Sequence, residues 1–111
     1  MTESQQIQAL RAQYQASLLE KSKTASAWAQ TLELNAQLDD VGVELEAWLH
    51  KIAGSAGMYG YQNIAQKARE LMARLASKNS LGAEISRELA QLSDMMAAHS
   101  GFANPYPTNP Q

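Results

Sequence analysis

The fold of this chain is decided by residues 47–61, which read AWLHKIAGSAGMYGY. Successive residues of an α-helix are about 100° apart around its axis. At that spacing one side of the segment is apolar, and its residues are Leu45, Trp48, Leu49, Ile52, Ala56 and Tyr59. The opposite side carries His50 with Val43, Ala47, Gly54 and Gly57. We therefore predict a helix that buries one face and exposes a histidine on the other.

The chain on both sides of this segment is also typical of helix. Strong helix formers dominate its composition, and prolines occur only at positions 105, 107 and 110. Apolar residues recur three and four positions apart, first at Ile7, Leu10, Tyr14 and Leu18, and again over residues 62–78 and 81–98. The N-terminal stretch is either one long helix or two helices with a kink around residues 17–22.

Short connections separate the expected helices. Residues 35–40 form a polar connection in which Asp39 or Asp40 caps a helix over 41–59, and Gly60 ends that helix in a left-handed turn. Asn79 and Ser80 form the next turn. Short connections favour antiparallel neighbours, so we predict an all-α, up-and-down antiparallel four-helix bundle with an additional N-terminal helical segment. The bundle spans residues 1–101, and residues 102–111 form an irregular, proline-containing tail.

The composition limits the function. The 111 residues fit one domain, and a net charge of −2 argues against binding nucleic acid. The chain has no cysteine, and its two histidines are far apart in sequence, so neither a thiol site nor a zinc site is expected. No apolar run resembles a signal peptide or a membrane span. We expect a cytoplasmic monomer that binds no membrane, metal or cofactor of its own.

The face around His50 is unusually bare. A glycine inside a helix costs roughly 0.5–1 kcal/mol relative to alanine, and Gly54 and Gly57 both lie on this face. They leave room beside the imidazole for a phosphoryl group or a second protein. An unprotonated imidazole nitrogen can attack an activated phosphorus and hold the group covalently. Lys51, and as a second candidate Lys67, supply a cation for the added negative charge.

Residues 49–72, LHKIAGSAGMYGYQNIAQKARELM, resemble the signature of the histidine-containing phosphotransfer (HPt) domain family. The resemblance rests on the histidine, the run from Ala53 to Gly57, the Gly60 turn and the apolar spacing that follows. It implies a four-helix bundle that passes phosphoryl groups to and from aspartates of receiver domains, in hybrid sensor kinases or response regulators. It implies His50 as phosphoacceptor, Gly54 as the small residue beside it, and Ser55 as a small hydroxyl position.

The chain departs from the family at Ala53, where many members have a lysine. Lys51 therefore becomes the better candidate for steadying a phosphohistidine, and transfer is expected to depend on a lysine and Mg²⁺ of the receiver. The residues that we expect to dock the receiver are Ala47, Ala53, Gly54, Gly57, Met58 and Lys67. His99 is expected to be structural or incidental.

Two other functions fit the same residues less well. A non-catalytic helical adaptor would bind a receiver or another signalling partner without phosphotransfer, and Ala53 keeps this alternative open. A histidine-kinase dimerisation domain also presents a histidine on a helix. However, the chain has no room for an ATP-binding domain and no glycine-rich nucleotide loop.

Overall fold

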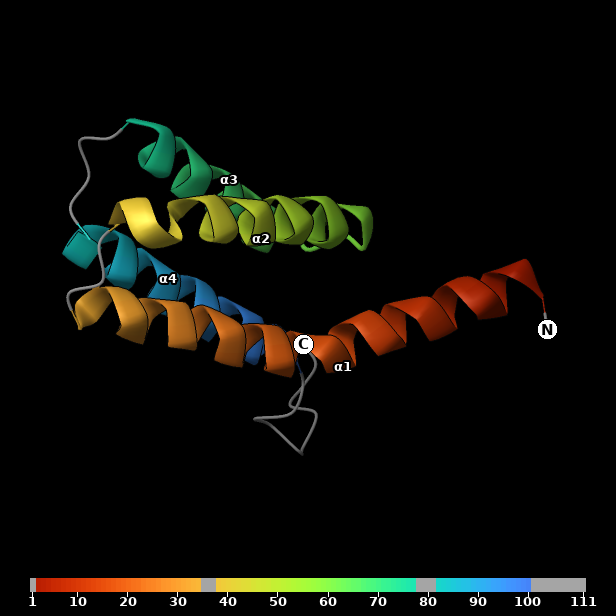
Figure 1. Cartoon of the computed structure of the whole chain (residues 1–111). Helices are drawn as coiled ribbons and strands as arrows, with labels where there is room; N and C mark the ends of the chain where they lie inside the picture. The colour runs from red at the N-terminus through yellow and green to blue at the C-terminus, as the bar shows by residue number, and fades with distance from the viewer. Residues whose placement is uncertain (1, 35–37, 78–81, 101–111) are drawn as a thin grey trace.

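The computed structural model describes residues 2–34, 38–77 and 82–100, and this part of the chain is a bundle of four α-helices (Figure 1). They are α1 (Glu3–Glu33), α2 (Leu38–Met58), α3 (Gln62–Ser77) and α4 (Gly82–His99). Each helix runs antiparallel to the one before it, and the closest pairs are α1 with α4 and α2 with α3. The predicted all-α, up-and-down bundle is confirmed. The predicted tail over 102–111 and the turn at Asn79 and Ser80 lie outside the described residues.

The core is built from large apolar side chains on all four helices. The largest fully buried ones are Leu18, Leu45, Leu49, Ile52, Ile64, Leu71, Ile85, Leu89, Leu92 and Met96. Burying one such side chain contributes about 1.5–3 kcal/mol. Because these residues recur at three- and four-residue spacing, each helix turns a single apolar stripe inward.

The N-terminal stretch is one continuous helix, α1, with no break at residues 17–22. Its start is fixed by a capping box. The Gln5 backbone N–H donates to Thr2 Oγ1 (3.1 Å), and the Thr2 N–H donates to Gln5 Oε1 (2.9 Å). This continuous helix includes the additional N-terminal segment that the sequence predicts.

The first three turns of α1 extend beyond the other helices (Figure 1). We call residues 3–13 of α1 the arm; all of them are exposed. Ile7 is 47% exposed and Leu10 is 49% exposed, whereas Leu18 is fully buried. The sequence pattern therefore places Ile7, Leu10 and Leu18 on one face of the helix correctly. Only the part of that face from Tyr14 onward is buried in the core.

The ends of α2 differ in how well the sequence predicts them. The helix begins at Leu38, so Asp39 and Asp40 lie inside it, and the expected polar connection over 35–40 is too long. Acidic residues are favourable in a first turn because of the helix dipole. At the other end Gly60 has φ of +90°, as predicted. The Tyr61 N–H donates to Ala56 O (2.8 Å) and the Gly60 N–H to Gly57 O (3.2 Å), which is a Schellman turn.

The same change, from leucine to alanine, at two sites of α1 tests whether the arm lies outside the core. We expect Leu18→Ala to lower the free energy of unfolding by about 2–5 kcal/mol, because it leaves a cavity in the core. Leu10→Ala removes a half-exposed side chain and should cost less than about 1 kcal/mol. Urea denaturation at low protein concentration measures both. Equal losses would mean that the arm is packed like the rest of α1.

Candidate functional site

His50 lies in the middle of α2 and is exposed, as the sequence predicts. The residues on the other side of the helix hold it there: Leu49 is fully buried and Ile52 is 2% exposed. Because one face of α2 is packed in the core, the His50 imidazole can move relative to the bundle only through its own side-chain torsions. The histidine is therefore presented to solvent from a rigid support.

Several small and apolar residues lie near His50 along the exposed side of the helix, which also carries the exposed Glu46 and Lys51. We call Val43, Ala47, His50, Gly54 and Met58 the outer face of α2; all five are exposed. Val43 is 80% exposed and Met58 is 74% exposed, which is unusual for large apolar side chains. A Cβ added at Gly54 would meet no atom within 4 Å. One turn beyond His50 the surface is thus open, and its edges are apolar.

Gly57 and Ala53 are less exposed than the sequence indicates. Gly57 is half-buried, and a Cβ placed on it would contact the Cβ of Ala65 on α3 at 3.9 Å. Ala53 is also half-buried and packs against the core. Gly57 is thus less exposed than the sequence predicts, although a contact of 3.9 Å would still leave room for a Cβ. Gly57 and Ala53 form the inner border of the outer face.

The two lysines predicted to assist His50 have different surroundings. Lys51 is exposed beside His50 and forms no ion pair with the described residues. Lys67 Nζ lies 3.1 Å from Glu88 Oε1 and donates to Gln91 Oε1 at 2.7 Å, both on α4. Glu88 also pairs with Arg74. Lys67 thus joins α3 to α4, and Lys51 is the cation that remains available next to His50.

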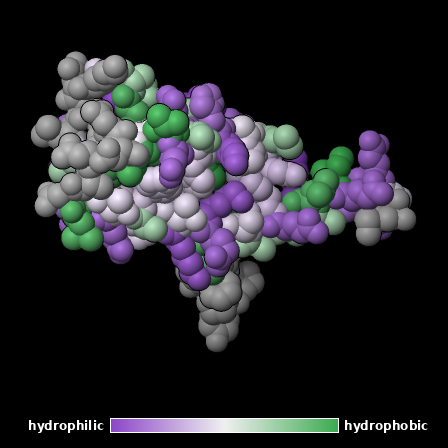
Figure 2. Space-filling view, in the orientation of Figure 1, coloured by the Kyte–Doolittle hydropathy of each residue, from purple (hydrophilic) through white to green (hydrophobic). Residues whose placement is uncertain are grey.

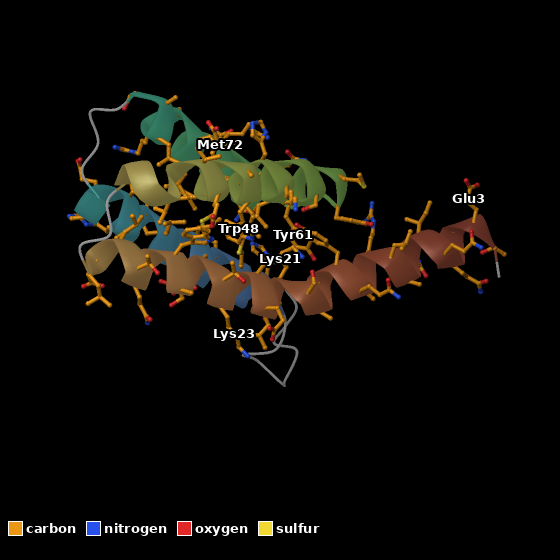
Figure 3. All side chains as sticks on the ribbon, in the orientation of Figure 1. Glu3, Lys21, Lys23, Trp48, Tyr61 and Met72 are labelled. Atoms are coloured by element: carbon orange, nitrogen blue, oxygen red, sulfur yellow. The ribbon has the colours of Figure 1, made fainter. Side chains whose placement is uncertain are left out.

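Ser55 links α2 to α1 through a contact that sequence reasoning missed. Its Oγ lies 2.8 Å from the Oη of Tyr14, which is itself 8% exposed. The Tyr14 ring stacks on Tyr59 with centroids 4.7 Å apart, and Lys21 Nζ lies 4.9 Å from the Tyr14 centroid. Figure 3 shows Lys21 and Tyr61 in this space between α1 and α2. The spacing of Tyr14 in α1 indicated burial, but nothing in it identified Ser55 as the partner.

Burial perturbs two groups in this contact. Desolvation raises the pKa of the Tyr14 phenol, the hydrogen bond to Ser55 acts in the opposite direction, and Tyr61 and Tyr59 add to the increase. Desolvation lowers the pKa of Lys21, since the ammonium is partly removed from water above an aromatic ring. Both changes have the same main cause, which is the partial removal of this contact from water.

The second histidine has a structural setting. His99 is the last residue of α4, and its ring meets Tyr61 edge-on with centroids 5.4 Å apart. Its Nε2 lies 3.2 Å from Asn63 Nδ2 at the start of α3. His99 therefore ties the end of α4 to the turn between α2 and α3, whereas His50 makes no such contact with the described residues.

Clusters of metal-ligand side chains and membrane-spanning helices are both absent from the described ranges. Within them, no cluster of three or more histidine or carboxylate side chains is placed to hold a metal ion. Nor does any helix there combine the length and apolar character needed to cross a bilayer. No protein-family model matches the chain, and neither a curated protein nor a solved structure matches it significantly.

Two glycines near His50 should respond oppositely to alanine. Gly54 is helical with open space around it, so Gly54→Ala should raise the free energy of unfolding by about 0.5–1 kcal/mol. Gly60 has a left-handed backbone, so Gly60→Ala should lower it by about 1–2 kcal/mol. Thermal or urea denaturation compares the two. A loss of stability in Gly54→Ala would show that Gly54 has a packing role.

The pKa of Tyr14 predicts a pH dependence of stability. Because the folded chain raises this pKa, the unfolded chain loses the phenolic proton first as pH rises. The contribution of Tyr14 is thus complete below about pH 10 and is lost as pH rises through the folded value. The free energy of unfolding should fall less steeply above pH 10 in Tyr14→Phe than in the parent chain. Identical slopes in urea titrations would contradict the burial of this phenol.

Proposed function

We propose that this chain is a histidine phosphotransfer protein and that His50 carries the phosphoryl group between receiver-domain aspartates of a two-component phosphorelay. The proposal rests on one observation above all. His50 is exposed in the middle of a helix that is anchored on its other side, and Gly54 leaves open space one turn away. The resemblance of residues 49–72 to the HPt signature points to the same chemistry.

The transfer step follows from the chemistry of imidazole. The unprotonated ring nitrogen of His50 attacks the phosphorus of an aspartyl phosphate on the receiver. A P–N bond forms, the P–O bond to the aspartate breaks, and the carboxylate leaves with the electron pair. Loss of the proton on the other ring nitrogen to water relieves the positive charge on the ring. The reverse step passes the group to a second receiver, so the chain is a carrier and not a self-sufficient enzyme.

Charge stabilisation is shared with the receiver. Lys51 is the cation of this chain nearest in sequence to His50, and its flexible stem can bring the ammonium toward a phosphoryl oxygen. Lys67 is already bound by Glu88 and Gln91, which makes it a poor candidate. Because position 53 is alanine, a lysine and Mg²⁺ held by the receiver stabilise most of the negative charge of the phosphoryl group.

The outer face of α2 supplies the docking surface in this proposal. Its exposed apolar residues Val43, Ala47 and Met58 lie along the helix on both sides of His50. Exposed apolar side chains of this size are common in interfaces that form and dissociate. Gly54 lets the backbone of a partner approach the imidazole closely. Gly57 and Ala53 extend the surface toward α3.

The direct test is transfer of label from a receiver domain charged with radiolabelled acetyl phosphate. The parent chain should acquire acid-labile label, and His50→Gln should remain at background while keeping its helical circular dichroism. The matched control is His99→Gln, which removes the other histidine and should accept label as the parent does. Label on His50→Gln, or loss of label in His99→Gln alone, would overturn the assignment.

A non-catalytic adaptor is the second candidate, and the exposed Val43 and Met58 together with Ala53 favour it. Labelling of the parent chain separates the two functions, and Gly54→Gln tests the carrier further because its side chain fills the open space beside His50. For a carrier, this variant should slow labelling at least about tenfold while its stability stays near that of the parent. For an adaptor, the parent itself binds receiver but acquires no label, and binding survives His50→Gln.

A further inference from the structure

The arm of α1 is a helix whose apolar stripe is left about half exposed by the other described residues. Ile7 and Leu10 are about half exposed, and the stripe continues into Tyr14 and Leu18, which are buried in the bundle. Figure 2 shows a hydrophobic patch on the arm, which projects away from the rest of the molecule. A helical segment of about three turns is only marginally stable in water without tertiary packing. A partner docked on the apolar stripe would remove its side chains from water and stabilise the arm.

The charges of the arm are unlike those of the other helices. Between Thr2 and Leu19 the sequence contains only two charged residues, Glu3 and Arg11, and the polar positions are mostly glutamine. The arm is therefore electrically neutral. A second arm can approach it without net repulsion, and with few charged groups to desolvate.

Glu3 and Arg11 are also arranged symmetrically. Each lies four residues from Ile7, one before it and one after it. If two arms pack antiparallel with their Ile7 residues on a twofold axis, Glu3 of each copy lies opposite Arg11 of the other. Such a twofold contact uses the same surface on both copies and closes on itself. The charge pattern thus matches a second copy of this chain.

The length of the arm fits the same register. With Ile7 on the axis, Thr2 of one copy lies opposite Ala12 of the other, because each is five residues from Ile7. At a rise of about 1.5 Å per residue, the start of each helix then stops just short of Tyr14, the first buried residue of the other copy. The length of the arm is thus compatible with the register that the charges select.

We propose that two copies of this chain associate through their arms in an antiparallel pair centred on Ile7. The inference goes beyond the proposed function and does not depend on it. The contact involves about three helical turns from each copy, well below the area of a standard stable interface, so the association is weak and reversible. His50 stays exposed in the pair, because only the arm takes part in the contact.

Sedimentation equilibrium tests the pairing over a range of protein concentrations. The parent chain should self-associate with a Kd of about 0.1–1 mM. The double variant with Ile7→Gln and Leu10→Gln should remain monomeric, with unchanged helical circular dichroism. A parent chain that is monomeric up to about 1 mM, or a double variant that associates equally well, would overturn the proposal.

Charge reversal tests the register. Glu3→Arg leaves arginine at positions 3 and 11, and Arg11→Glu leaves glutamate at both. Like charges then lie opposite each other, so each variant alone should associate about three- to tenfold more weakly than the parent. Mixed together, the two variants should form a heterodimer at least as tight as the parent pair. The matched control is Glu33→Arg, an exposed reversal at the far end of α1, which should change nothing. Two variants that fail to bind each other in the mixture would refute this register.

Discussion

The buried stripe of α2 fixes the rotation of that helix, and the direction of His50 depends on this rotation. Leu45, Leu49 and Ala56 are fully buried, and Ile52 is 2% exposed. Turning α2 by one residue, about 100°, would move these side chains toward water at a cost of about 1.5–3 kcal/mol for each large one. The same turn would bring His50 toward the core, where an imidazole without hydrogen-bond partners is unfavourable. The exposure of His50 is therefore a consequence of packing on the opposite face.

The glycines of α2 show which features the fold requires and which it tolerates. Gly60 is required, because its positive φ ends the helix and the Schellman hydrogen bonds depend on it. Gly57 faces Ala65, but a Cβ there would make only an ordinary contact at 3.9 Å, so the packing does not require a glycine. Gly54 is explained by neither, since it is helical and nothing lies within reach of a Cβ there. The fold thus gives up some helix stability at the residue one turn beyond His50, which is where a docking partner would need the space.

Local patterns in the sequence predicted a large part of this arrangement. The four helices, the inward stripe of α2, the exposed His50 and the left-handed Gly60 all follow from spacing and from glycine chemistry within a few residues. The contacts that the sequence did not predict join distant positions. Ser55 pairs with a tyrosine 41 residues away, and Lys67 with a glutamate 21 residues away. Periodicity gives the direction in which a side chain points, but it does not say what lies there. The same limit explains Ile7 and Leu10, which point along the core stripe at a place where the bundle has ended.

Tyr14 stands where the arm ends and the bundle begins, and it separates two surfaces of the molecule. Its phenol holds α1 to Ser55 on α2, and its ring stacks on Tyr59 in the turn that follows α2. The apolar stripe of the arm continues from Tyr14, so it faces the same side of α1 that the bundle covers further along. The outer face of α2 points away from the core and lies on a different helix. A partner on the arm and a partner on the outer face would therefore not compete for the same residues. Both surfaces belong to helices of one packed bundle, in which α1 is joined to α2 directly at Tyr14 and also through α4 and α3.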